Sequence, residues 1–418
     1  MSDVTVKPSQ LNGTVNIPPS KSDVHRAIIC AALAKGISTV SPVAYSEDIL
    51  ATIDCIKALG AKVYSNGDKI TIDSTKLFEP ESAVMNCRES GSTVRFFIPV
   101  AAAGGINAVF NGKGRLPQRP LNVYSELLPK HGIECKTEGG LPFEITGQLT
   151  AGRYNVPGNI SSQFITGLLF ALPLLDGDSV IHLTSPLESK GYIDMTISVQ
   201  RSFGVDIQTV GNDYIVKGSQ KYKSCDYITE GDWSQAAFFL AAGAIGGNVT
   251  VQGVKRNSFQ GDKEIVKLME RFGADVKQTD DSVSCCFNKL KGIEIDAAQI
   301  PDLVPILAVC GAFAEGTTII YNAQRVRLKE SDRLMAISDC LNSCGANVAE
   351  TDDGLLINGV PFIDGGSVKG YNDHRIVMSM AIAALRSREN IVISDRESIS
   401  KSYGNFFEDY RIIGGLCE

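Results

Sequence analysis

The stretch "IPPSKSDVHRAIICAALA" at residues 17–34 leads a polar loop directly into an apolar run. Its two prolines, Pro18 and Pro19, are incompatible with the interior of a regular helix or strand. Residues 20–26 then supply serine, lysine, histidine and arginine side chains. The run "AIICAALA" is apolar on every side, which predicts a buried helix. A polar segment at such a helix start is either a simple cap or a binding site for an anion.

The same junction recurs along the chain at nearly constant intervals. At six positions a strand-like segment gives way to an apolar helix, and by subtraction these positions are 70 or 71 residues apart. A glycine that follows an amphipathic helix recurs every 69 to 72 residues, as expected for a left-handed cap. The pattern predicts six repeats of strand, buried helix, strand, amphipathic helix and hairpin, or βαβαββ. The six junction residues are Ser20, Ser90, Ser161, Asp232, Asp302 and Asp373, and the six glycines are Gly60, Gly132, Gly204, Gly273, Gly345 and Gly415.

The ends of the chain indicate how the repeats are divided into domains. The sixth repeat stops at Glu418 without a hairpin, whereas residues 1–18 contain a spare hairpin-like segment. The simplest arrangement lets the N-terminus complete the last repeat. We therefore expect an α/β (α+β) protein with three repeats per domain: one domain at 19–226, and a second made of 1–18 and 227–418. A chain of 418 residues is also too long for one ordinary core.

Composition excludes several classes of protein. A net charge of −7 argues against a general nucleic-acid binder. No apolar run is long enough to predict a membrane span, and the N-terminus alternates like a strand rather than resembling a signal peptide, so we expect a cytoplasmic protein. The 11 cysteines are expected to be reduced thiols. Cys340 and Cys344 lie four residues apart on a predicted helix, but with four histidines and no matching second pair no metal site is expected.

Cations are concentrated at the predicted helix starts of this acidic protein. Each one alone could be surface charge, and each serine or aspartate there could be a plain cap. Together they favour phosphate or carboxylate binding, because helix N-termini present unpaired N–H groups and partial positive charge. The sequence lacks a P-loop, a G-x-G-x-x-G and a G-x-S-x-G motif, which argues against nucleotide hydrolysis, hydride transfer and serine hydrolysis. The cations are Lys21, Arg26, Arg95, Arg119, Lys329, Arg333, Arg375 and Lys401.

Ten short motifs, spread over the whole length, resemble those of the 5-enolpyruvylshikimate-3-phosphate synthases, members of the enolpyruvyl transferase family. The resemblance implies a two-domain inside-out α/β barrel and a monomer that closes by induced fit. It implies transfer of enolpyruvate from phosphoenolpyruvate to the 5-hydroxyl of shikimate 3-phosphate, with release of phosphate, in aromatic amino acid (chorismate) biosynthesis. No cofactor is implied. The motifs are "PPSKSDVHR", "ESGSTVRF", "LPQRP", "NISSQF", "SKGYID", "EGDWSQAAFFLAAG", "IPDLVP", "RLKESDRL", "YNDHR" and "KSYGNFF".

The same resemblance implies residue roles. Asp302 would accept the hydroxyl proton, and Glu330 would protonate carbon, with Lys21 as the competing acid and His374 also at the catalytic centre. The residues implied to bind shikimate 3-phosphate are Lys21, Ser22, Arg26, Ser161, Ser162, Gln163, Ser189, Tyr192, Asp302 and Lys329. Those implied to bind phosphoenolpyruvate are Lys21, Gly91, Arg119, Gln163, Arg333, Arg375 and Lys401.

Two alternatives remain at this stage. One is the related enolpyruvyl transferase that acts on UDP-N-acetylglucosamine, which would be expected to carry a loop cysteine where this chain has "GRLPQRPL" at 114–121. The other is a non-catalytic anion-binding protein on the same scaffold. It would explain the cations but has no use for Asp302 or Glu330. Three positions also depart from the family pattern: Arg325 replaces an asparagine, Glu89 stands in the loop before Gly91, and Gly404 replaces a proline.

Overall fold

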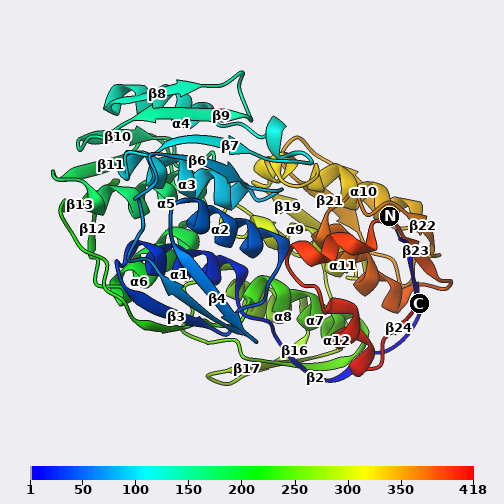
Figure 1. The fold of residues 1–418 in the computed structure, drawn as a ribbon. Coiled ribbons are helices and arrows are strands. Elements are labelled where there is room, and N and C mark those ends of the chain that lie inside the picture. The colour runs from blue at the N-terminus through cyan, green and yellow to red at the C-terminus, as the bar shows by residue number, and fades with distance from the viewer. Residues whose placement is uncertain (1) are drawn as a thin grey trace. The chain divides into compact units, whose positions relative to one another are not determined.

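The computed structural model describes residues 2–418 (Figure 1). The chain forms two compact units. Unit 1 comprises Met1–Pro18 and Glu230–Glu418, and unit 2 comprises Pro19–Thr229. Six four-stranded sheets are present, and each contains one parallel pair of strands, at one edge, and two antiparallel pairs. The predicted α/β class and the six βαβαββ repeats are confirmed, with the strand exchange described below.

Unit 2 contains three of these sheets. Their strands alternate buried and exposed residues, because one face packs on helices and the other meets solvent. The sheets are β14 (Asp226–Ile228), β3 (Ile37–Ser41), β5 (Lys69–Asp73) and β4 (Lys62–Asn66); β6 (Ser82–Asn86), β7 (Asn107–Asn111), β9 (Phe143–Gly147) and β8 (Ile133–Lys136); and β10 (Arg153–Val156), β11 (Ser179–Leu183), β13 (Asp213–Val216) and β12 (Ile207–Val210).

Unit 1 has the same organisation. Its three sheets are β16 (Asp275–Gln278), β17 (Ser282–Cys286), β15 (Asn248–Gln252) and β2 (Asn12–Asn16); β18 (Glu294–Asp296), β19 (Thr317–Tyr321), β21 (Leu355–Asn358) and β20 (Asn347–Glu350); and β22 (Gly366–Val368), β23 (Ile391–Ile393), β1 (Val4–Lys7) and β24 (Leu416–Cys417).

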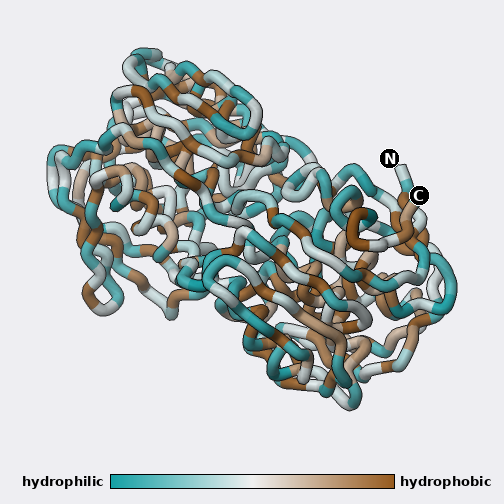
Figure 2. The backbone as a smooth tube through the Cα atoms, turned by 90° about the horizontal axis from the view of Figure 1, so that it is seen from below, coloured by the Kyte–Doolittle hydropathy of each residue, from teal (hydrophilic) through white to brown (hydrophobic). Residues whose placement is uncertain are grey.

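Each repeat contributes one buried and one partly exposed helix. The buried helices, such as α7, are apolar all round, and hydrophobic stretches recur along the chain in Figure 2. None of the helices in residues 2–418 combines the length and the apolar character that a membrane span requires. The helices of unit 2 are α1 (Lys21–Leu33), α2 (Glu47–Ala58), α3 (Gly91–Ala103), α4 (Asn122–Leu127), α5 (Ser162–Ala171) and α6 (Lys190–Ser202). Those of unit 1 are α7 (Trp233–Gly246), α8 (Ile265–Phe272), α9 (Val304–Ala312), α10 (Arg333–Ser343), α11 (His374–Ala383) and α12 (Phe406–Ile412).

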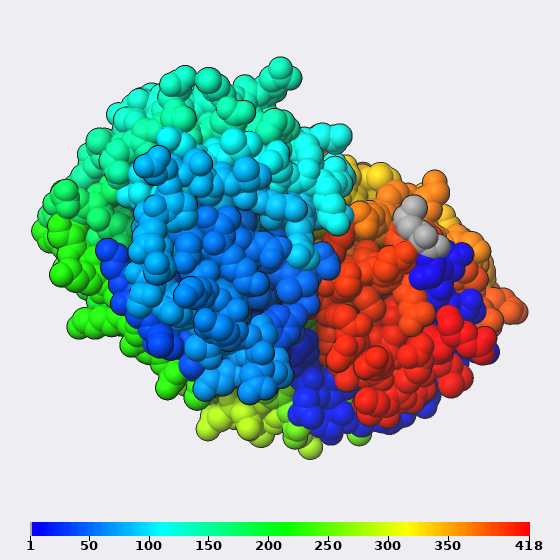
Figure 3. Space-filling view, viewed as in Figure 1, coloured from blue at the N-terminus to red at the C-terminus, as the bar shows by residue number. Residues whose placement is uncertain are grey.

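The N-terminal segment completes two sheets rather than one. Strand β1 pairs with β23 and β24 and so closes the sixth repeat, as predicted; in Figure 3 the dark blue N-terminal residues lie against the red C-terminal ones. The segment is not a hairpin, however, because β2 pairs in parallel with β15 of the fourth repeat. In exchange, β14 of the fourth repeat pairs with β3 of the first. Unit 2 therefore extends to Thr229 rather than to residue 226.

Helix caps follow the predicted junctions, with two corrections. The side chains of Ser20, Ser90, Ser161, Asp232 and Asp373 each accept a backbone N–H of the helix that they begin. Asp302 is no cap, because it lies inside a 3-10 turn, η5 (Pro301–Leu303), and α9 starts after that turn. The sixth glycine is also shifted by one residue. Gly414, with a φ of +104°, is the left-handed residue after α12, instead of Gly415.

A glycine allows two buried helices of unit 2 to approach closely. A β-carbon at Gly167 of α5 would lie 2.3 Å from the carbonyl oxygen of Arg95 on α3 and 2.5 Å from the Tyr124 hydroxyl. The single hydrogen of that hydroxyl is shared between the carbonyl oxygens of Arg95 and Phe164, at 2.7 and 2.9 Å, so the hydroxyl has little freedom to move. The close approach of α5 to α3, labelled in Figure 1, therefore depends on the missing side chain.

We expect Gly167→Ala to lower the free energy of unfolding by about 1–3 kcal/mol, because the added methyl group overpacks a rigid backbone contact. Gly404→Ala is the matched control, since a β-carbon there meets no atom within 4 Å. It should be neutral or stabilise by less than about 1 kcal/mol. Urea denaturation of both variants measures the difference. Equal midpoints for the two would contradict the packing argument.

Candidate active site

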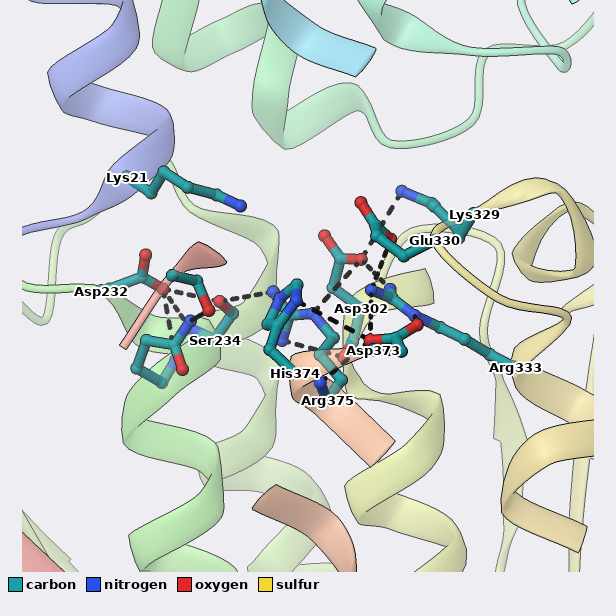
Figure 4. Close-up of polar contacts among 12 residues, drawn as sticks. Lys21, Asp232, Ser234, Asp302, Lys329, Glu330, Arg333, Asp373, His374 and Arg375 are labelled. Carbon is teal, nitrogen blue, oxygen red and sulfur yellow. Dashed lines mark hydrogen bonds and ion pairs between the residues drawn. The ribbon is translucent and has the colours of Figure 1, made fainter. Parts of the chain in front are cut away.

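Three helix starts of unit 1 direct carboxylates at one buried arginine (Figure 4). Asp302 comes from the turn before α9, Glu330 from the loop before α10, and Asp373 from the N-cap of α11. The arginine is Arg333, the first residue of α10, whose side chain is 1% exposed. Asp302 and Asp373 occupy equivalent positions of successive repeats, and Glu330 joins them from the loop before the intervening helix α10.

Every nitrogen of the Arg333 guanidinium is engaged by a carboxylate. Nη1 donates to Asp302 Oδ1 at 2.8 Å, Nη2 to Glu330 Oε2 at 2.7 Å, and Nε to Asp373 Oδ2 at 2.9 Å. Asp373 also accepts a hydrogen bond from the hydroxyl of Ser331 at 2.9 Å. The planar guanidinium suits this geometry, because its donors form a rigid fork. Arg333 therefore holds the three carboxylates in a defined arrangement.

The electrostatics of the cluster keep its charges in place. Burial by itself lowers the pKa of Arg333, but Asp373, Glu330 and Asp302 outweigh it and raise that pKa above its usual value. Burial tends to raise the pKa of Asp373, yet Arg333 and His374 bring it below its usual value. Arg333 stays protonated and Asp373 stays ionised at neutral pH. A buried pair of this kind is strongly destabilised when one partner is removed.

Two further cations surround Asp302. Lys329 Nζ lies 3.5 Å and Arg375 Nε 3.7 Å from Asp302 Oδ1. Burial lowers the pKa of Lys329, with Asp302 acting in the opposite direction. Arg375 also donates to the hydroxyl of Ser234 at 2.9 Å, and that hydroxyl donates to Asp232 at 2.6 Å. In this cluster three cations accompany three carboxylates, so the charge at these helix starts is compensated rather than simply positive as the sequence suggested.

The remaining predicted residues of unit 1 lie at the start of α11. Tyr371 and Asn372 both adopt left-handed backbone conformations, with φ of 55° and 48°, directly before Asp373. Lys401 donates to the carbonyl oxygen of Asn372 at 2.7 Å. His374 is buried, with Nδ1 3.7 Å from Asp373 Oδ1. Contrary to the prediction, Lys329 and Lys401 do not lie at α-helix starts but at the ends of the 3-10 turns η6 (Gln324–Leu328) and η8 (Arg396–Lys401). The same holds for Arg119 of unit 2, which follows the 3-10 turn η1 (Leu116–Gln118).

A second group of predicted residues lies in unit 2, where α1 begins. Lys21 Nζ bonds to Asp48 Oδ2 of α2 at 2.8 Å. Arg26 is buried and donates to Thr196 Oγ1 at 2.8 Å and to the carbonyl oxygens of Ser22 at 2.6 Å and Tyr192 at 3.1 Å. Burial lowers the pKa of Arg26 to about 10, so the group remains a cation at neutral pH.

The starts of α3 and α5 are joined through a glutamine. Arg95 Nη1 donates to Gln163 Oε1 at 2.7 Å, and Gln163 Nε2 donates to Ser92 Oγ at 2.8 Å. A β-carbon at Gly91 would lie 2.7 Å from Arg119 Nη1, so the absence of a side chain there leaves room for the Arg119 guanidinium. The structure thus brings Arg95, Arg119, Gly91 and Gln163 close together.

The predicted serines occupy two neighbouring helix starts. Ser161 caps α5 by accepting the N–H of Gln163 at 3.3 Å, and Ser162 is the first residue of that helix. Ser189 precedes α6 in a left-handed conformation, with a φ of 55°, and its side chain does not cap the helix. A strained serine that does not serve its own helix is typical of a functional position. Tyr192 follows one turn later on α6.

Sequence analysis missed several residues of these two groups. Asp48 and Thr196 lie 27 and 170 residues from the cations that they contact, so no local pattern indicates the pairing. Asp373 was recognised only as a junction residue, although its place in the sixth repeat was the available signal. Within residues 2–418, no group of three or more His, Cys, Asp and Glu side chains is arranged as a metal site.

Three comparisons relate the chain to known proteins. The family profile described as EPSP synthase (3-phosphoshikimate 1-carboxyvinyltransferase) matches residues 5–410. The 3-phosphoshikimate 1-carboxyvinyltransferase of Clostridium acetobutylicum is 46% identical over 99% of this chain and 98% of its own, and that of Clostridium novyi is 44% identical over 100% and 99%. The structure of EPSP synthase from Acinetobacter baumannii superposes with a TM-score of 0.84 at 27% identity, covering 100% of this chain and 99% of that one. The predicted inside-out α/β barrel is thereby confirmed.

We expect Asp373→Asn to lower the free energy of unfolding at pH 7 by about 3–5 kcal/mol, because Arg333 loses a buried partner. The pKa of Asp373 is lowered by folding, so its contribution is complete above the ordinary value of about 3.9. It is lost as pH falls through the folded-state value. The stability gap between variant and unmodified protein should therefore close in acid. Denaturation at several pH values, with exposed Asp352→Asn as control, tests this, and a gap independent of pH would contradict it.

Proposed function

We propose which buried polar residues bind each substrate and which transfer protons in this chain, which belongs to the EPSP synthase (3-phosphoshikimate 1-carboxyvinyltransferase) family. The protein is a transferase of the shikimate pathway, in aromatic amino acid biosynthesis. It moves the enolpyruvyl group of phosphoenolpyruvate to the 5-hydroxyl of shikimate 3-phosphate and releases phosphate.

The substrates define what the site must supply. Together they carry two phosphates and two carboxylates, which require cations and N–H donors. Addition to the enol ether requires a base for the hydroxyl proton and an acid that protonates carbon. Phosphate then leaves a tetrahedral intermediate. Proton transfer by a positioned side chain contributes roughly 10²–10⁴ in rate.

Unit 2 supplies the groups for shikimate 3-phosphate in this proposal. The buried guanidinium of Arg26 and the ammonium of Lys21 supply charge, while adjacent serine hydroxyls at a helix start suit a phosphate. The left-handed backbone at Ser189 supports this role, because it turns the residue away from capping its own helix. The proposed residues are Lys21, Ser22, Arg26, Ser161, Ser162, Gln163, Ser189 and Tyr192, together with Asp302 and Lys329 of unit 1.

Phosphoenolpyruvate is assigned to the arginine-rich positions. Arginine forks bind carboxylate and phosphate through two parallel hydrogen bonds, which Lys21 and Lys401 supplement as point charges. The room that Gly91 leaves for Arg119 supports a role for that pair. The proposed residues are Lys21, Gly91, Arg119, Gln163, Arg333, Arg375 and Lys401.

The observation that carries the catalytic proposal is the pairing of Asp302 and Glu330 with one guanidinium, at 2.8 and 2.7 Å. Neither residue caps an α-helix. Asp302, with Lys329 and Arg375 also nearby, is held as the carboxylate that a base requires. Glu330 Oε2 accepts a hydrogen bond from Arg333 Nη2 at 2.7 Å, and an anionic substrate that engages Arg333 would compete for this contact. Glu330 then becomes the acid, with Lys21 as competitor and His374 beside the cluster.

We also propose that the protein acts as a monomer in the cytoplasm. Light scattering of the purified protein measures its mass, and a value near 44.8 kDa agrees with a monomer.

The substrate assignment predicts which acceptor supports phosphate release. Purified protein with phosphoenolpyruvate should release phosphate when shikimate 3-phosphate is added and not when UDP-N-acetylglucosamine is added. Treatment with EDTA should leave the rate unchanged, because the proposed chemistry uses only side chains. Release with the second acceptor alone would favour the sister transferase, and binding without release would favour an anion-binding protein.

Asp302→Asn should lower kcat by roughly 10²–10⁴ while changing the dissociation constants of the substrates far less, because it removes a proton acceptor and keeps the size of the side chain. Asp352→Asn, at an exposed position of the same unit, is the matched control. Rapid-quench kinetics and isothermal titration calorimetry measure the two quantities. Unchanged kcat would remove Asp302 from the role of base.

A further inference from the structure

A continuous chain of side-chain hydrogen bonds crosses the interior of unit 2. His25 Nδ1 lies 2.6 Å from Thr52 Oγ1, which lies 3.0 Å from Thr93 Oγ1, which donates to Ser90 Oγ at 2.8 Å. All four residues are buried. They come from α1, α2 and α3, so three helices are joined by polar contacts within an otherwise apolar core.

The chain has a defined proton direction. Ser90 Oγ accepts both the hydroxyl of Thr93 and its backbone N–H, the latter at 3.2 Å as the cap of α3. Because the Thr93 hydrogen points to Ser90, Thr93 must accept from Thr52. Thr52 must then accept from His25, which places the imidazole proton on Nδ1. The order is His25 to Thr52 to Thr93 to Ser90.

The environment of His25 is consistent with a neutral ring. Its Nε2 is buried and has no hydrogen-bond partner in the described part of the chain, and the ring lies edge-on to Phe96 with centroids 6.3 Å apart. Burial, followed by the charges of Lys21 and Arg26, lowers the pKa of His25 well below its usual value. A buried, unprotonated Nε2 without a donor costs less free energy than a buried Nε2–H without an acceptor would. The Nδ1–H form therefore suits both nitrogens.

Helix α2, which carries Thr52, also contacts α1 and the loop before α3 through charged side chains. Asp48 of α2 holds Lys21, at the start of α1. Glu47 and Asp54 of α2 each bond to Arg88 at 2.8 Å, in the loop that leads to α3. Arg88 is itself in a left-handed conformation, with a φ of 49°. Helix α2 is thus hydrogen-bonded both to α1 and to the loop at the start of α3, although no residue of α2 is assigned to a substrate.

We propose that Thr52 is a positioning residue, which through His25 and through Thr93 and Ser90 sets the spacing between the start of α1 and the start of α3. The first start carries Lys21, Ser22 and Arg26, and the second carries Gly91. The inference rests on the proposed function, because it concerns how those ligands are held. A hydroxyl at the centre of three helices can do this, since both of its partners are buried and neither can turn to water.

Steady-state kinetics of Thr52→Val and Thr52→Ser test the proposal. Valine keeps the shape and removes the hydroxyl, so we expect the KM values of both substrates to rise roughly tenfold with kcat nearly unchanged, since loosened binding groups lose ground-state affinity. Serine keeps the hydroxyl and should restore the KM values to within about twofold. Thr318→Val is the matched control, because Thr318 is equally buried and its hydroxyl has no hydrogen-bond partner among the described residues.

Nitrogen-15 NMR of histidine-labelled protein provides a readout independent of activity. The His25 signals, assigned with a His25→Gln variant, should show the Nδ1–H tautomer and no titration near neutral pH, and Thr52→Val should shift them. The Nε2–H tautomer, or unchanged KM values in a folded Thr52→Val protein that is merely less stable, would overturn the proposal. No turnover by the unmodified protein would instead refute the proposed function, and the positioning role with it, while the NMR result would still decide whether the hydrogen-bond chain exists.

Discussion

The buried guanidinium of Arg333 is the constraint on which the organisation of unit 1 depends. Three carboxylates from three helix starts share it, and none of them could stay ionised in that interior without a cation. The repeat makes this meeting possible, because equivalent helices begin at the same end of each unit. The same arginine that stabilises the carboxylates also limits their chemistry. Asp373 is held by further hydrogen bonds, from the hydroxyl of Ser331 and from the backbone N–H of Arg375 at the start of α11.

Helix starts are used differently in the two units. In unit 1 acids and bases are gathered around one cation, and the charges are nearly balanced. In unit 2 the cations Arg26 and Arg95 are held mostly by neutral oxygens, from carbonyl groups, a threonine and a glutamine. Neutral acceptors orient a guanidinium without cancelling its charge. The charges of Arg26 and Arg95 therefore stay available to an anion, whereas the charge of Arg333 is compensated by the three carboxylates that it holds.

Two strands are exchanged between the first and the fourth repeat. Strand β2 and strand β14 each leave their own repeat and complete the sheet of the other. A parallel edge strand held by a row of main-chain hydrogen bonds anchors each crossing segment firmly in the unit it enters. Residues 18 and 19, and residues 229 and 230, are where one unit ends and the next begins.

The sequence by itself determined the repeat, the order of helices and strands, five of the six capped junctions and the family to which the chain belongs. These features are local, since a cap or a turn depends on residues within three or four positions of each other. Three features were decided only by the tertiary structure. Asp302 lies in the turn before α9 and bonds to Arg333, Asp48 pairs with Lys21, and β2 pairs with β15 of the fourth repeat. Such partners are tens to hundreds of residues apart, and packing of whole helices and sheets, rather than any neighbouring pattern, brings them within hydrogen-bonding distance.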